Sequence, residues 1–342
     1  MIRNFFPFLF ILISKISFCN NLYDTNFYNI NFISDDVERD KINKISNIKF
    51  DSINNIFNNI LTIKDYNFIK KTLDEDSINI LIKNIIIENE KIINNNYSAN
   101  IKINYNKKKI IEYLRLYKIG YIEHLPNNYL IIINEKNELS NNLFSKNNSY
   151  YKFLNNNSPL LNFYKIPELN INDRYLLTPD DIKNNNLKKI SQFVKKYEKN
   201  NAILLISKKN NNEFNYSSFL FVNDNLIKIE TLNQKKYNYF SLFNNLKDKV
   251  QNTWKEQNLI QNNSTFIINC DVNYFNLLEL RQIKMSTLNI STLKKIKLNS
   301  ISFKKNNYSL EFYGSLAVLP QLFNKYNLEI NINKDSCKIN LR

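Results

Sequence analysis

Two kinds of apolar pattern alternate along this chain, and their order limits the folds that it can adopt. The clearest unit covers residues 97–135. Every second side chain of residues 98–105 is apolar, which predicts a strand with one buried face. Residues 107–118 carry apolar side chains three and four positions apart, which predicts an amphipathic helix. The apolar run YLIIIN at 129–134 predicts a buried strand, so this unit is strand–helix–strand.

The same alternation continues to the C-terminus and predicts an α+β protein of three small sheet-and-helix modules. We place these modules at residues 21–135, 163–260 and 264–342, and we interpret the polar, aperiodic residues 136–162 as a linker. Without its last strand, the third module has the ferredoxin-like order β-α-β-β-α-β. Further strands are expected near residues 27–34, 85–93, 175–177, 202–207, 217–222, 226–232, 266–270, 293–302, 308–312, 328–332 and 338–341, and further helices near 42–61, 78–82, 187–197, 241–257, 274–283 and 316–326.

Glycine is nearly absent, with two residues in a chain of 342. Gly120 follows the predicted helix 107–118, at a position where a left-handed residue commonly ends a helix. Gly314 and Trp254 are interpreted as turn and packing residues. Two glycines cannot form a phosphate-binding loop, and the sequence contains no GxSxG, HExxH, P-loop or GxGxxG motif. These observations argue against a nucleotide-dependent enzyme.

The N-terminus has the pattern of a secretory signal peptide. Arg3 precedes an apolar run at residues 5–13, Lys15 ends that run, and small side chains stand at the −3 and −1 positions of a cut before Asn20. The run is too short to cross a bilayer, which needs about 20 apolar residues. The alternative is a buried N-terminal helix. We interpret residues 1–19 as a signal peptide and expect a periplasmic or otherwise exported protein with no later membrane span.

Cysteine use is sparse. Cleavage would leave Cys270 and Cys337, which is no disulfide framework; a single bridge is open in an oxidising compartment, but free buried thiols are the favoured interpretation. Lipidation of Cys19 is disfavoured because Phe18 is bulkier than the small residue usual before a lipidated cysteine. With one histidine and no CxxC motif, we expect no metal and no cofactor.

The net charge is +16, and removal of Arg3 and Lys15 would lower it to +14. Such a charge often marks a nucleic-acid or anionic-membrane binder. The abundance of Asn, Ile and Lys also fits the codon use of an AT-rich genome, in which lysine accumulates without a binding role. The basic residues are scattered, with short runs at 107–109, 208–209 and 294–295. We therefore expect no nucleic-acid partner.

Few residues are candidates for chemistry. His124 is the one histidine, and Asp180 and Asp181 are neighbouring carboxylates after a proline. Neighbours in sequence usually point apart, and acidic side chains stabilise the start of a helix, so capping is the favoured role of this pair. We assign no catalytic, cofactor-binding or metal-binding residue.

Several segments recur in an order and spacing that resemble a known family. They lie at residues 97–106 (YSANIKINYN), 110–114, 117–123 (YKIGYIE), 175–181 (YLLTPDD), 250–255, 313–315 and 339–342. Together they resemble the proteobacterial domain-of-unknown-function family 2066, whose members are secreted proteins of about this size. The resemblance implies export and the fold, and it assigns no activity.

We predict an exported envelope protein that is non-catalytic and docks another envelope protein or polymer as an assembly or maintenance factor. One alternative is a hydrolase of an envelope polymer that uses Asp180 with Asp181 or Glu123, which requires two carboxyl groups about 5–10 Å apart in one pocket. Another is a binder of anionic surfaces, which requires the lysines to gather on one face.

Overall fold

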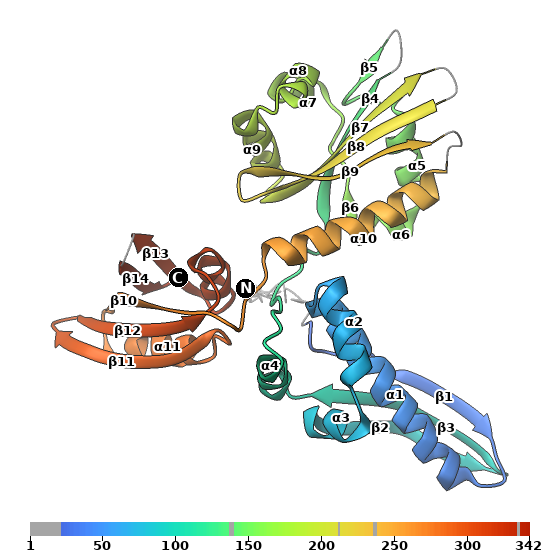
Figure 1. Cartoon of the computed structure of the whole chain (residues 1–342), viewed down its shortest axis with the longest axis vertical. Coiled ribbons are helices and arrows are strands. Elements are labelled where there is room, and N and C mark those ends of the chain that lie inside the picture. The colour runs from blue at the N-terminus through green and yellow to red at the C-terminus, as the bar shows by residue number, and fades with distance from the viewer. Residues whose placement is uncertain (1–21, 137–139, 211–212, 235–237, 334–335) are drawn as a thin grey trace, which may run out of the picture.

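The computed structural model describes residues 22–342 except 137–139, 211–212, 235–237 and 334–335. The predicted signal peptide, with Cys19, lies outside the described residues. The strands form three separate sheets, and each sheet is accompanied by its own helices (Figure 1). This arrangement confirms the α+β class and the sheet-and-helix modules.

The N-terminal module is an antiparallel sheet in the order β1-β3-β2 with helices on one face. Alternate residues of β3 are buried, as the sequence predicts, and they pack against the apolar side of α1. Asp36 caps α1, since its Oδ1 accepts from the Arg39 amide at 3.1 Å. The elements are β1 (Tyr28–Ile33), α1 (Val37–Ile60), α2 (Ile63–Thr72), α3 (Glu75–Leu81), β2 (Ile82–Ile93), β3 (Asn96–Tyr105) and α4 (Lys107–Leu116).

The middle module has a mixed sheet in the order β5-β4-β7-β8-β9, and β6 pairs with β4. The strand β4 runs parallel to β7 and antiparallel to β5. The elements are β4 (Tyr129–Lys136), β5 (Asn141–Asn142), α5 (Ser149–Asn155), α6 (Ser158–Leu161), β6 (Tyr164–Lys165), α7 (Ile171–Leu176), α8 (Pro179–Lys183), α9 (Leu187–Lys196), β7 (Asn201–Asn210), β8 (Glu213–Val222), β9 (Asn225–Gln234) and α10 (Tyr239–Gln257).

Two boundary predictions are wrong. The strand β4, which we placed in the module 21–135, belongs to the middle sheet, because its YLIII run is buried on both faces and requires helices on both sides. The predicted linker 136–162 contains β5, α5 and α6. Its side chains enter the middle core, for example Tyr151, whose hydroxyl accepts from the Ile133 amide at 2.8 Å.

A third prediction, a strand at 175–177, is also wrong, because these residues end α7. Asn170 caps that helix by accepting from the Asp173 amide at 3.0 Å. Asp173 is fully buried and accepts from Tyr197 Oη at 2.8 Å and from Lys196 Nζ at 2.6 Å. This buried network, which joins α7 to α9, fixes the helix and is invisible to local sequence patterns.

The C-terminal module has the predicted chain order, but its last strand is not peripheral. The sheet order is β11-β12-β10-β14-β13, so β14 lies between β10 and β13. In a ferredoxin-like fold the fourth strand lies beside the first, but here the fifth strand, β14, takes that place beside β10. The elements are β10 (Thr265–Asn273), α11 (Leu277–Leu288), β11 (Leu293–Ser302), β12 (Lys305–Tyr313), the short 3₁₀ helix η1 (Leu316–Val318), α12 (Leu319–Lys325), β13 (Leu328–Asn333) and β14 (Ser336–Leu341).

A disulfide joins Cys270 of β10 to Cys337 of β14. The two residues are paired in register in the parallel ladder, with their Cα atoms 4.4 Å apart. The favoured interpretation of free thiols is therefore wrong. The reason is the position of β14, which brings together two cysteines that lie 67 residues apart in sequence.

Asparagine takes over the backbone role that glycine usually has in turns. Asn94 and Asn95 join β2 to β3, and Asn223 and Asp224 join β8 to β9, all with positive φ. Asparagine and aspartate tolerate this left-handed region better than other residues with a side chain. A chain with two glycines can therefore still form tight hairpins.

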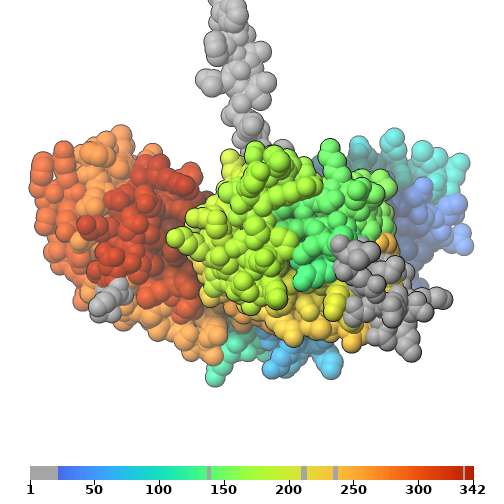
Figure 2. Space-filling model, turned by 90° about the horizontal axis from the view of Figure 1, so that it is seen from above, coloured from blue at the N-terminus to red at the C-terminus, as the bar shows by residue number. Residues whose placement is uncertain are grey.

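The three modules meet at one junction (Figure 1). One continuous cluster of buried apolar residues draws members from all three modules, while a second cluster lies in the middle module alone, between the sheet and α7 to α9. Seen from above, the C-terminal module lies on one side of the middle module (Figure 2).

Candidate functional site

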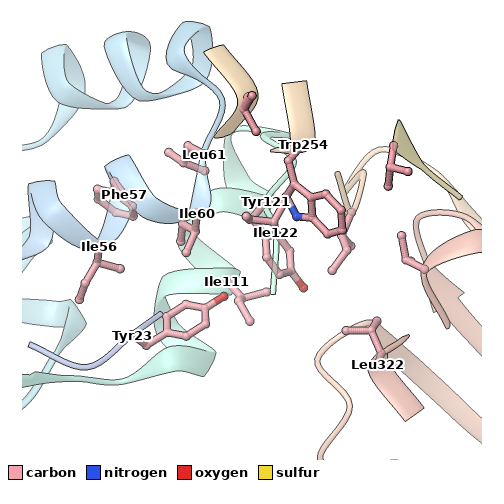
Figure 3. Packing of buried hydrophobic residues seen from close by; sticks show 14 of the residues in the cluster. Tyr23, Ile56, Phe57, Ile60, Leu61, Ile111, Tyr121, Ile122, Trp254 and Leu322 are labelled. Carbon is pink, nitrogen blue, oxygen red and sulfur yellow. The ribbon is translucent and has the colours of Figure 1, made fainter. Parts of the chain in front are cut away.

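A cleft of about 290 Å³ lies at the junction. It is lined by residues that all three modules supply: Glu123, His124, Asn200, Asn201, Trp254, Asn258, Ile260, Val318, Gln321, Leu322 and Lys325. Trp254, Tyr121, Ile122 and Leu322 are buried in the same apolar cluster beside it (Figure 3).

The segment after α4 holds the cleft together. Tyr121 and Ile260 form an antiparallel bridge, with N–H···O distances of 3.2 and 2.8 Å, and the Ile122 amide donates to Ile60 O at 2.9 Å. A Cβ atom on Gly120 would lie 2.7 Å from Leu259 Cγ. The glycine is therefore required for close approach of two segments. The predicted helix-ending role belongs instead to Lys118, whose φ is 56°.

Trp254 lies near the end of α10, on the apolar side of the helix, which packs on the middle sheet. Its Nε1 donates to His124 O at 3.2 Å, and its ring meets the Tyr129 ring edge-on at 6.1 Å. The neighbouring Lys255 is buried and donates to Asn58 O at the end of α1. Burial lowers the pKa of Lys255 to about 8. These contacts agree with the predicted packing role of Trp254. They also show that the end of α10, through Trp254 and Lys255, joins the middle module to the N-terminal one.

Glu123 is the most unusual group in the cleft lining. It is 4% exposed, and its Oε2 accepts from Lys107 Nζ at 2.8 Å. Its Oε1 is buried and has no hydrogen-bond partner among the residues that the structure describes. Burial first, and then the charge of Glu123, raise the pKa of Tyr23 and Tyr121. A buried carboxylate oxygen without a donor is costly, by about 1–3 kcal/mol or more, so this atom is poised to accept a hydrogen bond.

Asn201 is a second buried acceptor in the lining. It opens β7, is 8% exposed, and its Oδ1 lacks a partner within the described part of the chain. Lys325 supplies a positive charge and donates to Glu123 O at 3.5 Å. The cleft therefore combines two acceptors, one cation and an apolar wall.

His124 follows Glu123 at the edge of the cleft. Partial desolvation lowers its pKa, and the Lys325 ammonium lowers it further. The imidazole is therefore neutral at pH 7, where it can donate one hydrogen bond and accept another.

The structure does not bring the candidate carboxylates together. Asp181 Oδ2 accepts from the Thr178 hydroxyl at 2.7 Å and from the Thr178 amide at 3.0 Å, which completes a capping box at the start of α8. Asp180 is exposed on the same short helix, whereas Glu123 lies buried at the junction. The favoured capping role is confirmed for Asp181. Neither Asp180 nor Asp181 lines the cleft that Glu123 lines, whereas the hydrolase alternative requires two of these carboxyl groups in one pocket.

A second cleft, of about 410 Å³, contains three cations, Lys107, Lys108 and Arg115. Arg115 is already engaged, because its Nη2 donates to Ser291 O at 2.7 Å and its guanidinium lies 4.1 Å from the Tyr313 ring centre. Lys107 is paired with Glu123. Lys108 lies 4.0 Å from Glu112 of the same helix. Of the three cations, Arg115 is the one that joins the N-terminal module to the C-terminal module.

No group of three His, Cys, Asp or Glu side chains able to hold a metal ion occurs in the described residues. None of the helices within those ranges is both long enough and apolar enough to cross a bilayer. Comparisons with models of protein families and with curated proteins find no match to this chain.

Sequence reasoning found part of the cleft. It singled out Glu123, His124 and Trp254, which the structure brings together. It missed Asn201, Gln321 and Lys325, which carry no local pattern that separates them from the many other Asn, Gln and Lys residues.

Proposed function

We propose that this chain is an exported, non-catalytic envelope protein, of the kind found in domain-of-unknown-function family 2066, that docks another envelope component as an assembly or maintenance factor. The observation that carries the proposal is the junction cleft, whose lining comes from three modules, so that a single bound segment would contact all three at once.

The chemistry of the cleft favours a partner segment that donates hydrogen bonds. Glu123 Oε1 and Asn201 Oδ1 are buried acceptors whose desolvation is uncompensated within the described chain. An amine, guanidinium or backbone N–H of a partner would satisfy them, and Trp254, Ile260 and Leu322 would cover an adjoining apolar side chain.

Two further features support export. The N-terminal pattern is that of a signal peptide. The Cys270–Cys337 bridge is a bond that persists in oxidising compartments and is rare in the cytosol.

The test uses two matched variants on α12. Gln321 is exposed and lines the cleft, while Asn324 is exposed on the same helix and is not among the cleft-lining residues. Gln321→Trp fills the cleft, and Asn324→Trp adds the same bulk elsewhere. Tagged wild type and both variants are captured from fractionated cells, and the captured components are compared by mass spectrometry.

We expect one periplasmic component to come with wild type and Asn324→Trp and to be lost with Gln321→Trp, while both variants keep the wild-type thermal midpoint. Equal capture by all three proteins would reject the cleft as the docking site. Recovery of the chain in the cytoplasm with free thiols at Cys270 and Cys337 would reject export.

A further inference from the structure

The outer side of α11 is apolar, which is unusual for a surface helix. Ile283 and Thr287 face the sheet and are buried. Leu277 and Leu278 are 76% and 71% exposed, and Met285 continues the exposed line. The helix is therefore apolar on both sides, and only one side is covered by the described chain.

The apolar surface extends past the helix to the β11–β12 hairpin. The Tyr274 amide donates to Lys304 O at 3.1 Å, which holds the start of α11 beside the hairpin turn. Leu298 and Ile301 of β11 pair with residues of β12 whose side chains are buried on the α11 side of the sheet, so both face that side. We call this set the distal surface: Phe275, Leu277, Leu278, Met285, Leu288, Leu298, Ile301 and Phe303.

The distal surface lies on one arm of the molecule. The β11–β12 hairpin extends away from the N-terminal and middle modules (Figure 1). Phe303 at its turn is 88% exposed, and Phe275 is 81% exposed. Neither residue lines the junction cleft.

Positive charge gathers around these residues. Residues 274–305 contain seven basic residues and one acidic residue, whereas the whole chain contains 47 and 31. Lys294 and Lys305 pair with acidic residues of neighbouring strands. The remaining five have no ion pair within the described ranges: Arg281, Lys284, Lys295, Lys297 and Lys304. Lys295 and Lys297 pair with Glu311 and Ser309, which alternate with the buried residues of β12, so these two lysines face the opposite side of the sheet. Arg281 and Lys284 lie on α11, and Lys304 lies at the hairpin turn.

The one acidic residue, Glu279, is used within the helix start. Its Oε2 accepts from the Phe275 amide at 2.7 Å. The distal surface therefore combines exposed apolar residues with three cations that have no ion pair in the described residues, Arg281, Lys284 and Lys304.

This combination identifies the occupant. A second copy of the chain would place like charges against one another, which disfavours self-association. An anionic bilayer accepts leucine and phenylalanine at its interface, and its phosphates attract lysine and arginine, whose long side chains reach outward while their stems stay apolar. We propose that the distal surface binds an anionic membrane, with α11 lying in the plane of the interface.

Membrane binding by the distal surface is a specific form of the anionic-surface alternative, in which exposed apolar residues and nearby cations act together. Membrane binding does not use the junction cleft. It can therefore fail while the proposed docking function holds, and the docking function can fail while membrane binding holds.

The test is sedimentation with vesicles, using the chain from Asn20 onward so that the apolar N-terminal run does not contribute. The probes are vesicles of phosphatidylcholine mixed with phosphatidylglycerol and vesicles of phosphatidylcholine alone. The distal variant is Phe275→Ser/Leu278→Ser/Phe303→Ser. The matched control, which removes similarly exposed apolar residues elsewhere, is Ile33→Ser/Leu116→Ser/Ile171→Ser.

We expect binding to anionic vesicles that weakens with added salt, a loss of about tenfold or more in the distal variant, and little change in the control, because binding scales with the apolar area inserted and with the lipid charge. A second readout is Phe303→Trp, whose emission should shift to the blue on anionic vesicles.

Three results would overturn the proposal. The first is an equal loss of vesicle binding in the distal and control triple variants. The second is binding to neutral vesicles that is as strong as binding to anionic vesicles and does not change with salt. The third is no binding to either kind of vesicle, with an acidic protein or a second copy of the chain found on the distal surface instead.

Discussion

The Cys270–Cys337 disulfide should contribute a large part of the stability of the C-terminal module. The bond closes a loop across 67 residues, and loop-closure entropy assigns such a cross-link about 4 kcal/mol. Both sulfurs are buried and no other covalent link joins β10 to β14 within the described chain. The double variant Cys270→Ala/Cys337→Ala should therefore lower the free energy of unfolding of this module by about that amount.

The assay is urea unfolding followed by circular dichroism, together with hydrogen exchange of peptides from β10 and β14. Wild type in reductant serves as the control, because it breaks the bond and keeps both sulfurs. It should lose nearly as much stability as the double variant, and exchange in β10 and β14 should accelerate in both. A loss under about 1 kcal/mol in both cases, close to the error of the extrapolation, would refute the reasoning.

Three other predictions concern single residues. Gly120→Ala should destabilise the protein, because the added Cβ meets Leu259 Cγ at 2.7 Å, and Leu259→Ala should restore part of the loss in thermal denaturation. Asp181→Ala should cost about 1 kcal/mol in urea unfolding through loss of the capping box, whereas exposed Asp180→Ala should change little. Folding lowers the pKa of Lys255 to about 8, so above that pH the lysine is protonated in the unfolded chain but largely neutral in the folded one. The free energy of unfolding of wild type should therefore rise relative to that of Lys255→Met as the pH increases from about 8 to about 9.5. Parallel unfolding curves across that range would contradict the last of these.

Periodicity predicted most elements correctly because it reports directly on which side of an element is buried. The alternation at residues 98–105 became β3 with one buried face, and the spacing at 107–118 became α4. The run at 202–207 became the centre of β7. At these positions local preference and tertiary packing agree.

The errors share one cause, which is contact between segments far apart in sequence. Nothing near β4 tells that it pairs with β7 rather than with β3, and nothing near β14 tells that it enters the sheet beside β10. The disulfide was missed for the same reason. At residues 175–177 the buried Asp173 network overrode an extended-looking run.

The candidate site could be predicted only where sequence neighbours are also neighbours in space. Glu123 and His124 are adjacent in the chain, and both line the cleft. Asn201 and Lys325 reach it from other modules, so their position depends on the packing of α12 and β7 at the junction. No periodicity in one segment carries that information.

The junction determines whether the cleft and the distal surface can work as one device. Modules joined by small polar interfaces usually move relative to one another. Here a continuous buried cluster, the Tyr121–Ile260 bridge and the Arg115–Ser291 contact resist such motion. If both proposals hold, a component in the cleft is therefore kept at a set orientation to the membrane. Gly120→Ala tests this link, because it strains the junction and leaves the distal surface intact: capture by the cleft should fall while vesicle binding persists, and a parallel fall of both would mean that the C-terminal module needs the junction to fold.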